Sequence, residues 1–189
     1  AGTECYRAPN NAEPAVQAIC LDQFGYHQEA EIGYRMCLDL QGEDGDWADP
    51  EGWSHHWWSS SGFKSWAVIE HYKLTRDRAY LEKVFPRMLA SSRYHERRRS
   101  ETRKLVNGER PLTYGLMPRG QGDCGLFDGE DYYGVYYPHN FWAVFADACA
   151  AEAARILGRP EQKELEEIYE KARADLLASL AAGAILEED

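Results

Sequence analysis

The sequence lacks the apolar segments that membrane proteins and secreted precursors carry. No apolar stretch approaches the roughly 20 residues that a helix needs to cross a bilayer, and the apolar start of a signal peptide is also missing. Paired cysteine spacing is absent too, since the cysteines are scattered singly: Cys5, Cys20, Cys37, Cys124 and Cys149. An odd, scattered set indicates free thiols in a reducing compartment. We therefore expect a cytoplasmic protein without a membrane partner.

Acidic residues outnumber basic residues in this sequence. The chain has 32 acidic residues against 21 Lys and Arg residues, a net charge of -11, whereas a nucleic-acid surface needs positive charge. The densest basic cluster, residues 97–99, lies beside Glu96 and Glu101, which is typical of a solvated helix end. No CxxC or HxxxH pair indicates a structural zinc. We expect no nucleic-acid partner, no metal and no cofactor.

The hydrophobic pattern has a helical period throughout and alternates convincingly nowhere. Apolar residues recur at intervals of three and four, as one face of a helix requires. Four such sets are Ala30, Gly33, Tyr34, Cys37 and Leu38; Leu81, Val84, Phe85, Met88 and Leu89; Phe141, Val144, Phe145, Ala148 and Cys149; and Leu165, Ile168, Tyr169 and Ala172. The pattern predicts six helices, at about 11–22, 26–41, 62–74, 78–103, 138–157 and 160–182.

Proline, aspartate and glycine mark the boundaries of these predicted helices. Pro14 and Pro160 lie near helix starts, where the missing N–H of proline costs nothing. Asp77 can cap the fourth helix, and Gly158 can end the fifth. Pro86 falls inside the fourth helix, so we expect a kink or a break there.

The connections between the predicted helices alternate in length. Short turns join helices one and two, three and four, and five and six, and short turns make antiparallel hairpins. About 20 residues join the first hairpin to the second, and over 30 join the second to the third. We predict an all-α chain of three antiparallel helical hairpins, at about 11–41, 62–103 and 138–182, in a single domain over 1–189. Alternation then places both long connections at the same end.

The two long connections carry the residue types of a sugar-binding site. The first holds tryptophans and histidines, namely Trp47, Trp53, His55, His56, Trp57 and Trp58. The second is rich in glycine and leads into the fifth helix, and it supplies Arg119, Asp123, Asp128, Glu130, Asp131, Tyr132, His139, Asn140 and Trp142. Aromatic rings cover the apolar faces of pyranoses, carboxylates accept hydrogen bonds from hydroxyls, and one carboxyl can move a proton. The alternative is a glycine-rich surface loop with solvated charge.

Several of these residues have a structural alternative to ligand contact. Arg119 could hold a sugar hydroxyl or a uronic acid carboxylate, or it could pair with an acidic neighbour. Asn140 could contact a ligand or cap its helix, and Trp142 could line a bore or fill the core. For the two adjacent histidines, hydrogen bonding to a sugar beside stacked tryptophans competes with simple loop packing. One or two of the tyrosines between positions 132 and 137 are expected to line a subsite.

Short motifs recur along nearly the whole chain. Residues 21–30 read L-x-x-x-G-x-x-x-E-A, and residues 41–47 read Q-x-x-x-G-x-W. Residues 71–81 contain Y-x-x-T-x-D-x-x-x-L at a predicted hairpin turn. Residues 115–123 read G-L-x-P-x-G-x-G-D and are followed by the Asn-Phe-Trp of 140–142. Together these motifs resemble those of the six-hairpin glycosidases, whose fold is an (α/α)6 toroid.

The resemblance implies about half of such a toroid, because a complete one needs six hairpins and this chain supplies three. In the sugar-phosphorylase branch of that superfamily the Asp after G-x-G is the general acid, so Asp123 takes that role by position. That branch continues with Trp where this chain has Cys124, and Asp128, Glu130 and Asp131 are the alternatives. An inverting glycosidase places acid and base about 6.5–9.5 Å apart on distant hairpins, so the base is expected outside this chain.

We therefore expect a carbohydrate-active enzyme that cleaves glycosidic bonds by inversion, with an oligo- or polysaccharide as substrate. A phosphorylase would be a version of it that requires inorganic phosphate. A second interpretation is a polysaccharide lyase or sugar epimerase that uses the tyrosines near position 132 with His139. A third is a non-catalytic glycan-binding half-toroid. A half-toroid leaves one apolar flank uncovered, so its partner is expected to be the missing half or a second copy of the chain.

Overall fold

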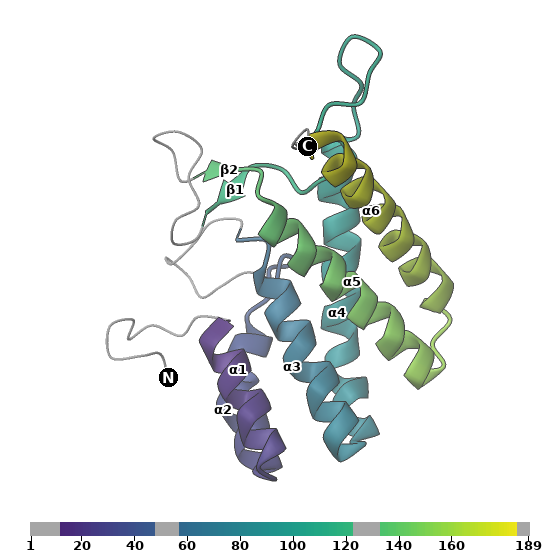
Figure 1. Cartoon of the computed structure of the whole chain (residues 1–189). Helices are drawn as coiled ribbons and strands as arrows, with labels where there is room; N and C mark the ends of the chain where they lie inside the picture. The colour runs from purple at the N-terminus through teal and green to yellow at the C-terminus, as the bar shows by residue number, and fades with distance from the viewer. Residues whose placement is uncertain (1–11, 48–56, 123–132, 185–189) are drawn as a thin grey trace, which may run out of the picture.

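The computed structural model of the protein describes residues 12–47, 57–122 and 133–184 (Figure 1). Within these ranges the chain is all-α apart from one minimal two-stranded ladder. The helices are α1 (Ala12–Gln23), α2 (His27–Asp39), α3 (Ser60–Thr75), α4 (Arg78–Thr102), α5 (Tyr137–Leu157) and α6 (Gln162–Gly183). The predicted all-α class is confirmed, and every predicted helix boundary lies within two residues of the observed one.

The capping residues act as the sequence indicates. The Asp77 carboxylate accepts a hydrogen bond of 2.9 Å from the Tyr80 N–H at the start of α4, which satisfies one of the free donors of the first turn. Gly158 ends α5 in the left-handed conformation, with φ of 64°. Pro86 does not break α4, which continues through it. The carbonyl left without its helical donor belongs to Glu82, which is exposed and can be hydrated.

The helices pack as three consecutive hairpins, with α3 lying between α1 and α5 (Figure 1). The short turns gather at one end. Arg78, which opens α4, donates to the carbonyl oxygens of Ile156 and Leu157 at the end of α5. Asp22 at the end of α1 accepts hydrogen bonds from His71 near the end of α3 and from His27 in the next helix. The long connections leave from the opposite end of the bundle (Figure 1).

Helix α5 is buried on nearly every side, and this corrects one sequence-based prediction. The predicted core face of α5 includes Phe141 and Phe145, yet both of these side chains are exposed, at 48% and 40%. The positions that carry α5 into the core are mostly alanines, namely Ala143, Ala146, Ala150, Ala151, Ala153 and Ala154. Because alanine is small, α5 can approach α3, α4 and α6 closely and bury its surface without large side chains.

The sequence pattern did not predict the two strands, β1 (Gly120–Gln121) and β2 (Tyr133–Gly134). They pair antiparallel, with Gly120 opposite Gly134 and Gln121 opposite Tyr133. Two residues are too few to show an alternating pattern, so periodicity has no signal to detect here. In the described part of the chain, no helix combines the length and apolar character that crossing a bilayer requires.

Candidate functional site

The described parts of the two long connections are joined by a part-buried hydrogen bond. The indole N–H of Trp58, which precedes α3, donates to the carbonyl oxygen of Pro118 at 2.8 Å, across 60 positions of sequence. Trp58 packs with Tyr94, Met117 and Ala143 in a small buried cluster. The expected convergence of the two connections on one rim is therefore confirmed. Trp58 itself is buried, so it joins the connections together instead of offering an open ring to a ligand.

Asn140 fastens the same segment from the side of α5. Its side-chain oxygen accepts a hydrogen bond of 2.8 Å from the Met117 N–H, and its side-chain nitrogen donates to the Tyr136 carbonyl oxygen at 2.9 Å. Asn140 is buried. The helix begins one turn earlier, with Tyr136 at the N-cap position, so capping, one of the two predicted alternatives for Asn140, is wrong. Its amide is occupied by the connection that it holds.

The segment that follows is held by the strand pair. Arg119 is exposed, and its guanidinium donates to the Tyr133 carbonyl oxygen beside the β1–β2 ladder. The other residues predicted for this connection and for the preceding one lie outside the described residues, namely Trp53, His55, His56, Asp123, Asp128, Glu130, Asp131 and Tyr132. The second described range stops at Gly122, one position before the predicted general acid.

Trp47 is a core residue, which corrects its predicted contact with sugar. Its side chain is 1% exposed and belongs to the main hydrophobic core. The indole N–H donates to the Leu38 carbonyl oxygen at 3.0 Å, and its own carbonyl oxygen accepts a hydrogen bond from the buried Lys64 ammonium at 3.2 Å. A ring enclosed in this way has no free face for stacking, so we remove Trp47 from the candidate site.

An aromatic groove is formed by side chains of α3 and α5. It is an open hollow of about 290 Å³, and it is lined by Trp66, Phe141, Trp142 and Phe145. The rings form a connected set, since the Trp142 ring centroid lies 4.1 Å from Phe63 and 5.9 Å from Trp66. Four aromatic side chains gathered at one open hollow make this surface a candidate binding surface. We call this surface the aromatic groove.

The aromatic groove continues toward the rim of long connections. The half-buried ring of Trp57 lies 6.0 Å from Phe63 and 6.4 Å, edge on, from His139. His139 is buried, with its Nδ1 atom 3.5 Å from the Ser59 hydroxyl. Trp142 is partly buried, packs against Phe63 and Trp66 of α3, and lines the groove, so it does not fill the core, and its predicted place in a toroid bore stays a prediction. Of the predicted site residues that are described, Trp57, His139 and Trp142 are brought together here.

A buried polar chain lies beneath this region and was not predicted from the sequence. The Ser61 hydroxyl is 3.0 Å from His95 Nε2, His95 Nδ1 is 2.9 Å from Asp147 Oδ1, and Arg99 donates to Asp147 Oδ2 at 2.6 Å. Burial by itself raises the pKa of Asp147, but Arg99 and His95 outweigh it and hold that pKa below its ordinary value. All four side chains are buried, so no substrate can reach the serine, and the arrangement joins α3, α4 and α5.

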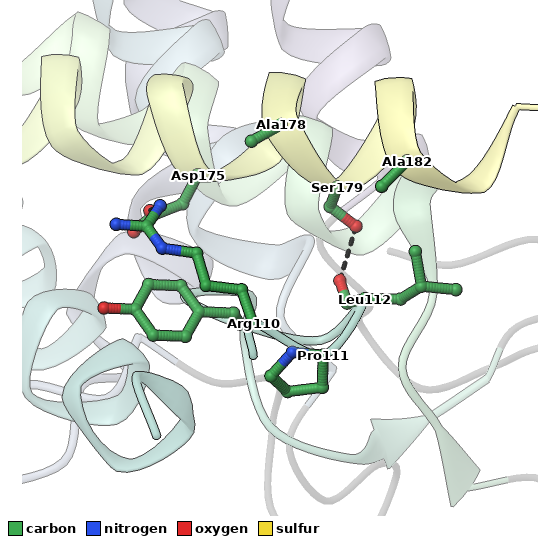
Figure 2. Close-up of a pocket in the computed structure, with 8 residues that line it drawn as sticks. Arg110, Pro111, Leu112, Asp175, Ala178, Ser179 and Ala182 are labelled. Atoms are coloured by element: carbon green, nitrogen blue, oxygen red, sulfur yellow. Dashed lines mark hydrogen bonds and ion pairs between the residues drawn. The ribbon is translucent and has the colours of Figure 1, made fainter. Parts of the chain in front are cut away.

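Figure 2 shows a second hollow, of about 230 Å³, between the connection after α4 and helix α6. The Arg110 guanidinium lies 4.4 Å from the centre of the Tyr114 ring, and its Nη1 atom is 3.8 Å from Asp175 Oδ1. The Ser179 hydroxyl donates to the Leu112 carbonyl oxygen at 2.5 Å (Figure 2). These contacts occupy the polar groups of the hollow with each other, so it fastens the connection to α6.

Neither thiols nor clustered metal ligands offer another centre in the described ranges. Among these residues, no group of three or more His, Cys, Asp and Glu side chains is arranged to hold a metal ion. Cys20, Cys37 and Cys149 are free cysteines, and burial raises the pKa of Cys149 to about 12.

A scan against protein-family models gives no match for this chain, and comparisons with curated proteins and with solved structures give none either. The candidate site therefore stands on its geometry alone.

Proposed function

We propose that this chain is part of a carbohydrate-active enzyme that cleaves glycosidic bonds by inversion, with Asp123 as the general acid. The observation that carries the proposal is the meeting of the two long connections at the end of the aromatic groove. The Trp58–Pro118 hydrogen bond joins those connections, and Trp57 links them to Phe63, whose ring lies against Trp142 of the groove. The acid is thereby expected next to a surface suited to sugar rings.

The chemistry of the groove fits a pyranose substrate. Its lining is almost purely aromatic, and aromatic faces stack against the C–H faces of sugars while excluding water. Stacking alone does not break a bond, so a carboxyl group must protonate the leaving oxygen. An inverting mechanism also needs a second carboxylate about 6.5–9.5 Å from the acid to activate water. We assign that base to a part of the (α/α)6 toroid outside this chain.

The same groove supports a partner for the chain. In the toroid that we propose, α1, α3 and α5 form half of the inner ring, and the missing hairpins or a second copy complete it. Phe141 and Phe145 are the most exposed of the four residues that line the groove. Their exposure is typical of a surface that a ligand or another part of the protein covers.

A non-catalytic glycan-binding half-toroid is the second candidate, and the same exposed rings favour it. Binding needs the aromatic groove alone, whereas hydrolysis also needs Asp123 and a base. The two functions therefore differ in whether a bound oligosaccharide is turned over.

The test is a glycan panel assayed both for binding and for release of reducing sugar, on the complete protein that includes the proposed base, with Asp123 either intact (wild type) or replaced in Asp123→Asn. Glu43→Gln is the matched control, because Glu43 is an exposed carboxylate on the other long connection. We expect wild type and the control to cleave the same glycans and Asp123→Asn to lose at least about 100-fold in turnover. Wild-type turnover by Asp123→Asn would remove the acid assignment, and saturable binding without turnover by wild type would favour the second candidate.

A further inference from the structure

We propose that Trp58 and Asn140 are positioning residues that fix the backbone leading to the general acid. This inference rests on the proposed function, in which the acid is Asp123. The segment concerned is described from Met117 to Gly122, directly before that residue in the sequence. Neither positioning residue touches substrate, since each acts through the backbone that it holds.

The two residues hydrogen-bond to the backbone of two consecutive residues, one to an N–H group and the other to a carbonyl oxygen. Asn140 accepts from the Met117 N–H at 2.8 Å, and Trp58 donates to the Pro118 carbonyl oxygen at 2.8 Å. Asn140 comes from α5, whereas Trp58 comes from the connection before α3, so the segment is held from two sides. Because both hydrogen bonds go to backbone atoms of the segment, they fix the path of its backbone directly. The side chains of the segment take no part in these two bonds.

The side chains of Asn140 and Trp58 are both held in place by further contacts. Asn140 is oriented by its second hydrogen bond, to the Tyr136 carbonyl oxygen. The Trp58 ring packs near Tyr94, with centroids 6.2 Å apart, and has the Arg98 guanidinium 5.6 Å from its centre. The rim is thus tied to α4 as well as to α5, and Met117 in the segment is fully buried.

The strand pair extends this control toward the acid. Gly120 and Gln121 pair with Gly134 and Tyr133, so the backbone is fixed two positions after Pro118 as well. A general acid works only within hydrogen-bond reach of the oxygen that it protonates. A displacement of about 1 Å can cost on the order of 100-fold in rate. Loosening these hydrogen bonds should therefore lower proton transfer and leave sugar binding intact.

The decisive variant is Trp58→Phe, which keeps an aromatic ring but removes the N–H donor to Pro118 together with part of the indole ring system. Trp47→Phe is the matched control, because it also removes a buried indole N–H bond, to Leu38, at a distance from the segment. Both variants lose one hydrogen bond of the same kind inside the fold. A general loss of stability would therefore appear in both, and a positioning effect only in Trp58→Phe.

The first measurement is amide hydrogen exchange, which needs no activity. We expect the peptide covering Met117 to Gly122 to exchange about tenfold faster in Trp58→Phe than in wild type, and unchanged in Trp47→Phe. Equal exchange in Trp58→Phe and wild type would overturn the inference, whatever the protein is found to cleave.

The second measurement uses two aryl glycosides of the sugar that the wild type cleaves, one with a phenol and one with 2,4-dinitrophenol as leaving group. Dinitrophenolate departs without a proton, so only the phenyl glycoside depends on a placed acid. We expect kcat of Trp58→Phe to fall about tenfold on the phenyl glycoside, with KM and the dinitrophenyl rate within about twofold of wild type. An equal loss on both substrates, or no loss, would overturn the inference.

Asp123→Asn separates this inference from the proposed function. If Asp123→Asn shows no preference for the dinitrophenyl glycoside, the acid assignment fails. Hydrogen exchange then decides alone whether Trp58 fixes the segment. If Asp123→Asn shows the preference and Trp58→Phe does not, the acid stands and the positioning role is lost.

Discussion

Arg99 and Asp147 form an ion pair with an Nη1 to Oδ2 distance of 2.6 Å, and their side chains are 1% and 0% exposed. The pair joins α4 to α5, the helix at the centre of the candidate site. His95 holds the other carboxylate oxygen of Asp147. Removing one partner of such a pair leaves a buried charge without compensation, and this cost exceeds what the intact pair contributes.

Arg99→Met should therefore destabilise the protein strongly. We expect a loss of about 3–5 kcal/mol in the free energy of unfolding, because the Asp147 charge stays buried without its main partner. The control is Arg93→Met, which breaks the exposed Arg93–Glu164 pair and should change that free energy by less than about 1 kcal/mol. Urea unfolding at pH 7 measures both, and equal losses would contradict the burial argument.

The Asp147 carboxylate should make stability depend on pH in the acid range. Its pKa lies below the ordinary value, because Arg99 and His95 outweigh the effect of burial. A lowered pKa contributes stability that is complete above the ordinary value, about 4, and is lost as pH falls below it. The difference in unfolding free energy between wild type and Asp147→Asn should thus shrink from pH 7 to pH 3. A difference that stays constant over this range would contradict the assignment.

Two helical glycines should respond oppositely to alanine. A Cβ on Gly62 would lie 2.6 Å from the Trp142 carbonyl oxygen, whereas a Cβ on Gly33 meets nothing within 4 Å. Gly62→Ala should cost about 1–3 kcal/mol, because α3 and α5 must move apart. Gly33→Ala should gain about 0.5–1 kcal/mol from helix propensity. Thermal unfolding of both variants checks this, and a gain for Gly62→Ala would refute the close contact of the two helices.

Phe145→Ser tests the aromatic groove by binding. The side chain is 40% exposed, so its removal should change stability by less than about 1 kcal/mol. Affinity for an oligosaccharide that wild type binds should fall about three- to tenfold, because one stacking face is lost. Leu177→Ser, at an exposed α6 position outside the groove, should bind as wild type does. Isothermal titration gives both affinities, and an unchanged affinity for Phe145→Ser would place the sugar elsewhere.

The helices could be predicted because their signals are local. The Asp77 cap and the Gly158 terminus need only neighbouring backbone groups, and the apolar period of α4 faces a core whatever the partner helix is. The buried face of α5 could not be predicted from such local signals. Periodicity weights large apolar residues, so it favoured Phe141 and Phe145, whereas close packing with three neighbouring helices buried the alanines instead.

The site was predictable in outline and not in its contacts. Alternating connection lengths sufficed to predict the common rim, because they depend on topology alone. The partner of Trp58 is a carbonyl group 60 positions away, and that of Trp47 is the Leu38 carbonyl near the end of the preceding helix, α2. Nothing in the two sequence neighbourhoods distinguishes a tryptophan that pins a loop from one that fills the core. The His95–Asp147 contact likewise joins residues from two helices without a local motif.

The span of the Trp58–Pro118 bond also has a consequence for folding kinetics. The bond closes a loop that contains the whole of α3 and α4, and contacts of long sequence separation form slowly because loop closure must precede them. We expect the second hairpin to assemble first and the rim segment to become ordered late, after α5 has supplied Asn140. A nascent chain that has not yet synthesised α5 would then carry the intact hairpin while its rim segment still lacks one of its two anchors.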